Sequence, residues 1–212
     1  MDQTPTEVTH LIDRLRAGDR QALGALFQGY RQRLRRMVEL RMDARLRTRL
    51  DASDILQEAY LDLAGDLDAY RADPKLQPLL WMRLHVGRRL TMLHRRHLGT
   101  GMRDAGLEIS LYREALPQAS SAALASMLLG QHTSPTQAAQ RAERLLRIQE
   151  ALNTLDPIDR EVLALKHFEE LSRAETAEVL GISAEAAAKR YFRALKRLKE
   201  VLASMPGGWE GI

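Results

Sequence analysis

One face of the predicted C-terminal helix carries a line of cations. Residues 184 to 204 have a helical period, and Ser183 is placed to cap them. The outward positions, spaced i, i+3, i+4, i+7 and i+11, are Ala186, Lys189, Arg190, Arg193 and Arg197. Lysine and arginine can donate hydrogen bonds to guanine edges in the major groove and to phosphates. Phe192 flanks the line and offers an apolar contact for a thymine methyl.

A short helical pattern precedes this helix and completes a predicted helix-turn-helix. Ser172 and Glu175 form a capping box at its start, and Gly181 interrupts it before the cationic helix. Such a motif places its second helix in the major groove of DNA. The alternative interpretation is a helical hairpin whose basic face only meets solvent.

A second basic segment, residues 81 to 98, combines an indole with arginines. One face of this helix, away from its apolar stripe, would carry Trp81, His85, Arg88, Met92 and Arg95. Stacking on an aromatic ring beside cations is how proteins hold single-stranded nucleic acid. The alternative is that Trp81 packs at the edge of the helix.

The segment DASDILQEAYLDLAGDLDAY, residues 51 to 70, is an amphipathic helix with an acidic and polar outer face. That face, called the acidic face below, consists of Asp51, Asp54, Gln57, Glu58 and Asp62. Carboxylates disfavour contact with DNA, so the acidic face suits a basic protein partner or only water.

Composition excludes several classes of function. The chain has 212 residues, a net charge of +4 and no cysteine, which excludes disulfides and thiolate metal sites. It shows no apolar run near the roughly 20 residues of a membrane span and no secretion signal, so we expect a cytoplasmic protein without membrane insertion. A phosphate-binding glycine loop is lacking, and Arg95 and Arg96 between His94 and His97 disfavour a metal. We therefore expect no enzyme, no catalytic residue, no metal and no cofactor.

The periodicity predicts an all-α protein of two small helical domains joined by a flexible linker. We place the first domain at 1–98, the linker at 99–133, the second domain at 134–204 and a tail at 205–212. The linker is rich in breakers, although a short helix near 121–129 fits its sequence.

In order and spacing, these motifs resemble bacterial sigma-70 family sigma factors of the extracytoplasmic-function (ECF) type. The resemblance covers about 10–98 and 134–203, with GDRQALGALFQGY, DASDILQEAYLDL, WMRLHVGRRLTMLHRRH, LNTLDPIDREVLALKHFEELSRAETAEVLGIS and AEAAAKRYFRALKRL. It implies a region 2 bundle first and a region 4 helix-turn-helix last. The stretch EISL, residues 108 to 111, is similar to the linker of members from planctomycete-like bacteria.

The resemblance also implies a role for each surface. Core RNA polymerase would be bound through its β′ coiled coil by Asp51, Asp54, Gln57 and Glu58, with its β flap as a further contact. The −10 promoter element would be melted and held near Trp81, Arg88, Arg89, Arg95 and Arg96. The −35 element would be read by Lys189, Arg190, Phe192, Arg193 and Arg197. An anti-sigma factor is a further expected partner. Two residues depart from the family pattern: Arg88 stands where asparagine is usual, and Ala188 where lysine or arginine is common.

Two other functions fit the residues. A stand-alone regulator, with an N-terminal dimerisation or sensing domain, would bind duplex DNA tightly without polymerase. A protein-interaction module would tolerate charge reversal at Arg193.

Overall fold

The computed structural model describes residues 4–98, 117–129 and 138–204, and every regular element in these ranges is helical. The chain divides into two compact units, Met1–Pro117 and Gln118–Ile212. The predicted all-α class is confirmed. Most of the predicted linker, EISL and the predicted tail lie outside the described residues. No helix in the described part of the chain is long and apolar enough to cross a bilayer.

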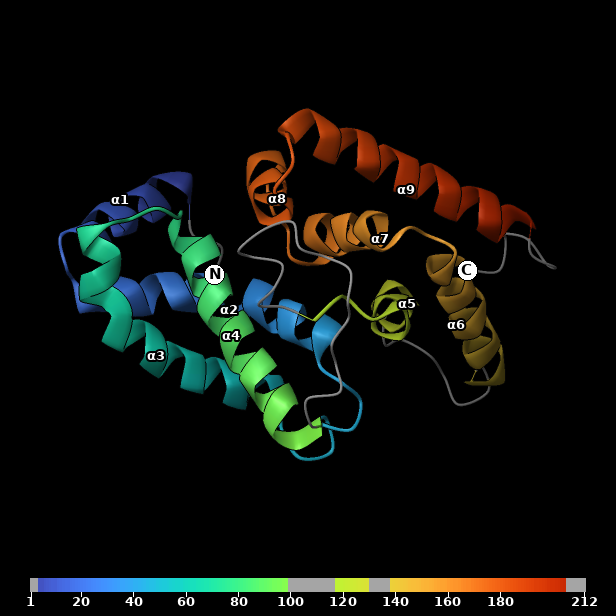
Figure 1. Ribbon diagram of the computed structural model, residues 1–212, viewed down its shortest axis with the longest axis horizontal. Coiled ribbons are helices and arrows are strands. Elements are labelled where there is room, and N and C mark those ends of the chain that lie inside the picture. The colour runs from blue at the N-terminus through green and yellow to red at the C-terminus, as the bar shows by residue number, and fades with distance from the viewer. Residues whose placement is uncertain (1–3, 99–116, 130–137, 205–212) are drawn as a thin grey trace. The chain divides into compact units, whose positions relative to one another are not determined.

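The first unit consists of helices α1 (Pro5–Arg16), α2 (Arg20–Arg41), α3 (Ala52–Ala72) and α4 (Pro78–Leu98). Figure 1 shows α4 lying across α2, and α2 packs against α1, α3 and α4. The predicted apolar stripes meet in one core, which includes Leu26 and Met37 of α2, Leu63 of α3, and Met82 and Leu90 of α4, all fully buried. Removing such side chains from water is the main force holding a small bundle together.

Local capping explains where two of these helices begin. The Asp19 carboxylate accepts hydrogen bonds from the amides of Gln21 and Ala22 at the start of α2. Asp51 and Asp54 form a reciprocal capping box at the start of α3. Such caps satisfy amides that have no partner inside the helix and contribute about 1 kcal/mol each.

The second unit consists of α5 (Ser121–Leu129), α6 (Ala138–Asn153), α7 (Pro157–Leu163), the π-helical segment η2 (Ala164–Phe168), α8 (Arg173–Leu180) and α9 (Ala184–Ser204). Helix α5 packs on α6, while α7 and α8 both pack on α9. The expected short helix near 121–129 is present, but it belongs to this unit rather than to a linker. The amide of Ala119 donates to Glu161, and Arg160 donates to the hydroxyl of Ser121.

Helices α8 and α9 form the predicted helix-turn-helix (Figure 1). Ser172 and Glu175 make the predicted capping box at the start of α8. Gly181 ends α8 with a positive φ of 63°, a conformation that glycine adopts without a steric cost. The hydroxyl of Ser183 then accepts a hydrogen bond from the amide of Ala186, which starts α9.

Candidate nucleic-acid and protein interfaces

Helix α9 presents part of the predicted cationic line to solvent. Lys189, Phe192 and Arg197 are exposed, and 65% of Phe192 is accessible. Lys189 pairs with Glu185 at 2.6 Å, but both side chains are largely exposed, so the pair contributes little to stability. The side chain of Arg193 is also 60% exposed, so the line presents three exposed cations beside an aromatic ring.

Two arginines of the same line instead reach toward α7. Arg193 donates from Nε to Oδ2 and from Nη2 to Oδ1 of Asp159, both at 2.8 Å, and Arg190 donates from Nη1 to Oδ1 at 2.8 Å. Burial by itself would raise the pKa of Asp159, but the hydrogen bonds from Arg193 and Arg190 outweigh it and hold the pKa below its usual value. Only 29% of the Arg190 side chain is exposed, so Arg190 departs from the predicted outward orientation.

Trp81 lies in the core of the first unit, with 4% of its surface exposed. Its ring stacks on Tyr70 with centroids 4.1 Å apart, and it meets His85 edge-on at 5.5 Å. The hydroxyl of Tyr70 is satisfied by the carbonyl of Leu76 at 2.8 Å. The expectation that the indole shares the outer face with arginines is thus wrong, because Tyr70 at the end of α3 supplies an aromatic partner inside the unit.

The remaining arginines of α4 fall into two groups. Arg88, Arg95 and Arg96 are exposed, as predicted. Arg89 crosses to α3, where it pairs with Asp62 at 2.6 Å and with Glu58 at 3.4 Å. A predicted DNA-contacting cation is therefore joined to the acidic face in this structure.

Within the acidic face, capping separates two residues from the others. Asp54 accepts a hydrogen bond from the amide of Asp51 at 3.0 Å, and Asp51 accepts one from the amide of Ser53. That amide lowers the pKa of Asp51. Gln57 and Glu58 are exposed further along α3. Asp51 and Asp54 therefore stabilise the start of α3 by capping it.

Sequence reasoning missed an exposed leucine in this face. Leu61 is 66% exposed, and on a helix it neighbours Gln57 at i, i+4 and Glu58 at i, i+3. The signal was present in the sequence, since Leu61 falls out of phase with the buried stripe through Leu56 and Leu63. An apolar side chain beside acids is a typical feature of a protein-binding surface.

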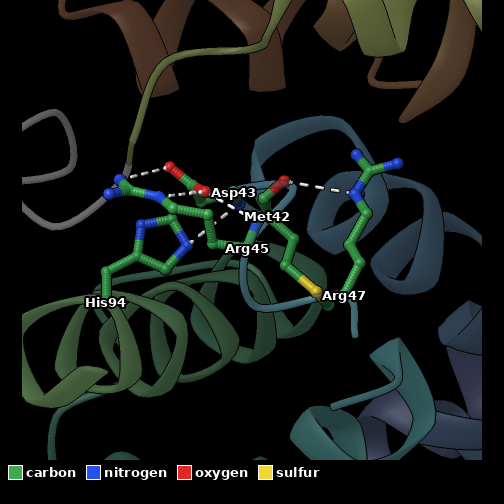
Figure 2. A network of polar contacts seen from close by, with 5 residues as sticks. All are labelled: Met42, Asp43, Arg45, Arg47 and His94. Carbon is green, nitrogen blue, oxygen red and sulfur yellow. Dashed lines mark hydrogen bonds and ion pairs between the residues drawn. The ribbon is translucent and has the colours of Figure 1, made fainter. Parts of the chain in front are cut away.

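Sequence reasoning also missed a polar network between α4 and the segment 42–50 (Figure 2). The ring of His94 points from α4 to this segment, and its Nε2 accepts a hydrogen bond from the amide of Asp43 at 3.3 Å. Arg45 pairs with Asp43 at 3.0 Å. Hydrogen bonds from the side chain and the amide of Arg45 lower the pKa of Asp43 to about 2. Arg47 donates to the carbonyls of Met42 and Glu39. Among the residues that the structure describes, no group of three or more acidic or histidine side chains could hold a metal ion.

Comparisons with known proteins identify the family. The family model for Sigma-70, region 4 matches residues 145–198, the part of the chain that holds the helix-turn-helix. An RNA polymerase sigma-E factor of Streptomyces avermitilis is 32% identical over 174 residues, which cover 79% of this chain and 83% of that protein. The ECF RNA polymerase sigma factor SigD of Mycobacterium tuberculosis is 30% identical over 186 residues, covering 87% of this chain and 78% of that protein.

A solved structure supports the same fold. The structure of CnrH in complex with the cytosolic domain of CnrY matches with a TM-score of 0.51 and 21% identity, over 91% of this chain and 94% of that chain. The two curated relatives match across most of the chain at 30% identity or more. The chain therefore belongs to the ECF-type sigma-70 family of RNA polymerase sigma factors, which act in transcription initiation.

Proposed function

We propose that the two units divide promoter recognition between them. In this proposal α9 reads the −35 element as a duplex, and the exposed arginines of α4 hold the −10 element after it melts. The observation that carries the proposal is the exposed part of the cationic line, Lys189, Arg193 and Arg197, on the second helix of a capped helix-turn-helix. Exposed Phe192 lies beside this line. A sigma factor directs core polymerase to DNA and is not itself an enzyme.

The burial of individual residues guides which of them we propose as direct contacts. Arg88, Arg95 and Arg96 are the proposed −10 contacts, because each is exposed on α4. Trp81 and Arg89 would act indirectly, since the first is buried and the second is paired with Asp62. Extruding a base costs a few kcal/mol, and arginine contacts to the displaced strand would offset part of that cost.

Core polymerase would meet the acidic face through its β′ coiled coil. Exposed Gln57, Glu58 and Leu61 are the proposed contacts, and Asp51 and Asp54 would keep this end of α3 helical. The second unit would contact the β flap. Working with polymerase on promoter DNA would place the protein in the cytoplasm.

An anti-sigma factor is a proposed partner as well. The related structure of CnrH contains the cytosolic domain of CnrY. That complex concerns CnrH, and for this chain it supports only the proposal that a protein can cover its surfaces. A planctomycete-like origin is proposed from EISL alone.

Run-off transcription tests the division of labour. Core polymerase is mixed with the full chain on genomic fragments, and the strongest promoter is then made in two forms, fully paired and with a mismatched bubble at −10. We expect Arg95→Ala with Arg96→Ala to lower transcription on the paired template and to be largely rescued by the bubble, because melting is no longer required. The double variant Lys189→Ala with Arg197→Ala should fail to support transcription on either template.

Two results would contradict this assignment. Equal rescue of both double variants by the bubble would remove the separate −35 role of α9. Promoter-specific duplex binding of full strength without polymerase would instead favour a stand-alone regulator.

A further inference from the structure

Asp159 is a buried acid that faces the proposed DNA-reading helix but was not among the predicted site residues. Only 5% of Asp159 is exposed, whereas the side chain of Arg193 is 60% exposed. The carboxylate lies on α7, and it accepts three hydrogen bonds of 2.8 Å from two arginines of α9. The acid thus sits behind the helix, while one of its partners reaches into solvent.

We propose that Asp159 is a positioning residue for base reading: it fixes the guanidinium of Arg193 so that its free end can meet a guanine, and it holds Arg190 away from the bases. This inference rests on the proposed −35 role of α9 and adds to it a specificity-determining residue outside that helix.

The hydrogen bonds define which donors of Arg193 remain. A guanidinium has five N–H donors in a rigid plane. Asp159 accepts from the Nε donor and from one Nη2 donor of Arg193. These two donors lie along one side of the guanidinium. The end of the group, formed by Nη1 and the second Nη2 donor, is left over. Two parallel donors of this kind match the O6 and N7 acceptors of guanine in the major groove.

Fixing the side chain changes specificity more than general affinity. An unrestrained arginine loses rotamer entropy when it binds, and it can reach phosphates as readily as bases. When the carboxylate holds the side chain, the guanidinium of Arg193 already has one orientation before DNA binds. Without that carboxylate, Arg190 and Arg193 would repel each other at i, i+3, and both could turn to the phosphate backbone.

Arg190 has a different place in this arrangement. Its side chain is 29% exposed and its Nη1 donates to the same Oδ1 that accepts from Arg193. Two cations around one buried acid leave a net positive charge, so the cluster still attracts the backbone. We assign Arg190 to the support of Asp159 rather than to a base.

The test measures base preference with the full chain and core polymerase. A promoter library with a randomised −35 segment is transcribed, and the transcripts are sequenced. We expect the wild type to prefer guanine at one position, Arg193→Ala to lose that preference, and Asp159→Asn to weaken it by about tenfold at the same position and at no other. Asp156→Asn is the matched control. Asp156 is the exposed cap of α7, three residues before Asp159, and carries the same charge, so its loss should leave the base preference unchanged.

A double variant separates positioning from stability. In an Arg193→Ala background, Asp159→Asn should cause no further change in base preference, because the residue it positions is absent. If Asp159→Asn does not fold, Asp159→Glu keeps the charge, shifts the carboxylate by one methylene, and should still weaken the preference.

The possible failures are distinguishable. A wild-type chain without any −35 preference would overturn the proposed function together with this inference. A clear preference that Arg193→Ala removes but both Asp159 variants retain would overturn this inference alone.

Discussion

At the scale of single residues, His94 shows how one proton can change a contact between two segments. Its Nε2 accepts from the amide of Asp43, so this nitrogen must be unprotonated while the contact exists. Burial lowers the pKa of His94 and the charge of Arg45 lowers it further, against the opposite effect of Asp43. The neutral ring is therefore the form that the folded first unit prefers.

This preference predicts a pH-dependent stability. Because the pKa of His94 is lower in the folded chain than the usual value of about 6.5, the unfolded state binds more protons, and the free energy of unfolding falls as pH drops below about 6.5. His94→Gln keeps an acceptor but does not titrate, so its urea-unfolding free energy should fall less between pH 7.5 and 5.5. His85 and His167, whose pKa values are also lowered mainly by burial, remain in both proteins. Parallel pH curves for the two proteins would contradict the prediction.

At the scale of elements, the connections between helices set their geometry. The turn from α1 to α2 contains Gly18, which has a φ of 94°. A Cβ added there would lie 2.6 Å from the guanidinium of Arg71 on α3, which itself donates to the carbonyl of Arg16. The glycine thus permits both the left-handed turn and the close approach of α3.

Two glycine substitutions in the first unit should have opposite effects. Gly18→Ala should lower the free energy of unfolding by about 1–2 kcal/mol, because alanine is strained at a positive φ and Arg71 must move. Gly65→Ala, inside α3 with open space around its Cβ position, should raise it by about 0.5–1 kcal/mol through helix propensity. Urea unfolding of both variants measures the difference, and an equal sign for the two changes would refute the explanation.

At the scale of the whole molecule, surfaces of opposite charge lie on separate helices. The acidic face lies on α3, while exposed cations lie on α4 and α9. Charge complementarity of this kind raises association rates and selects partners. Under the proposed function, it would let polymerase and DNA bind without competing for one surface.

A charge reversal on α3 tests the acidic face. Glu58→Lys should weaken association with core polymerase by about tenfold at low salt, with a smaller effect at high salt because exposed charges are screened. Asp68→Lys is the matched control, since Asp68 is also exposed on α3 and lies outside the defined face. Binding is measured with labelled chain and core enzyme. Equal effects of the two reversals would indicate a general charge effect instead of a contact.

Much of the architecture was predictable because it depends on neighbours in the chain. The cap formed by Asp19, the capping box of Ser172 and Glu175, and the break at Gly181 all follow from contacts within a few residues. Local hydrogen bonds and helical periodicity are enough for these features, since they do not require the helices to be packed.

The availability of each site residue was decided by packing instead. The sequence by itself determined two helical modules, a helix-turn-helix, and the charge of each face. Only the tertiary structure decided that Trp81 is buried against Tyr70 and that Arg89 pairs with Asp62. It also decided that Asp159 holds two arginines of α9. Partners tens of residues apart leave no periodic signal, because whether an outward side chain meets water or an opposite charge depends on which helix lies beside it.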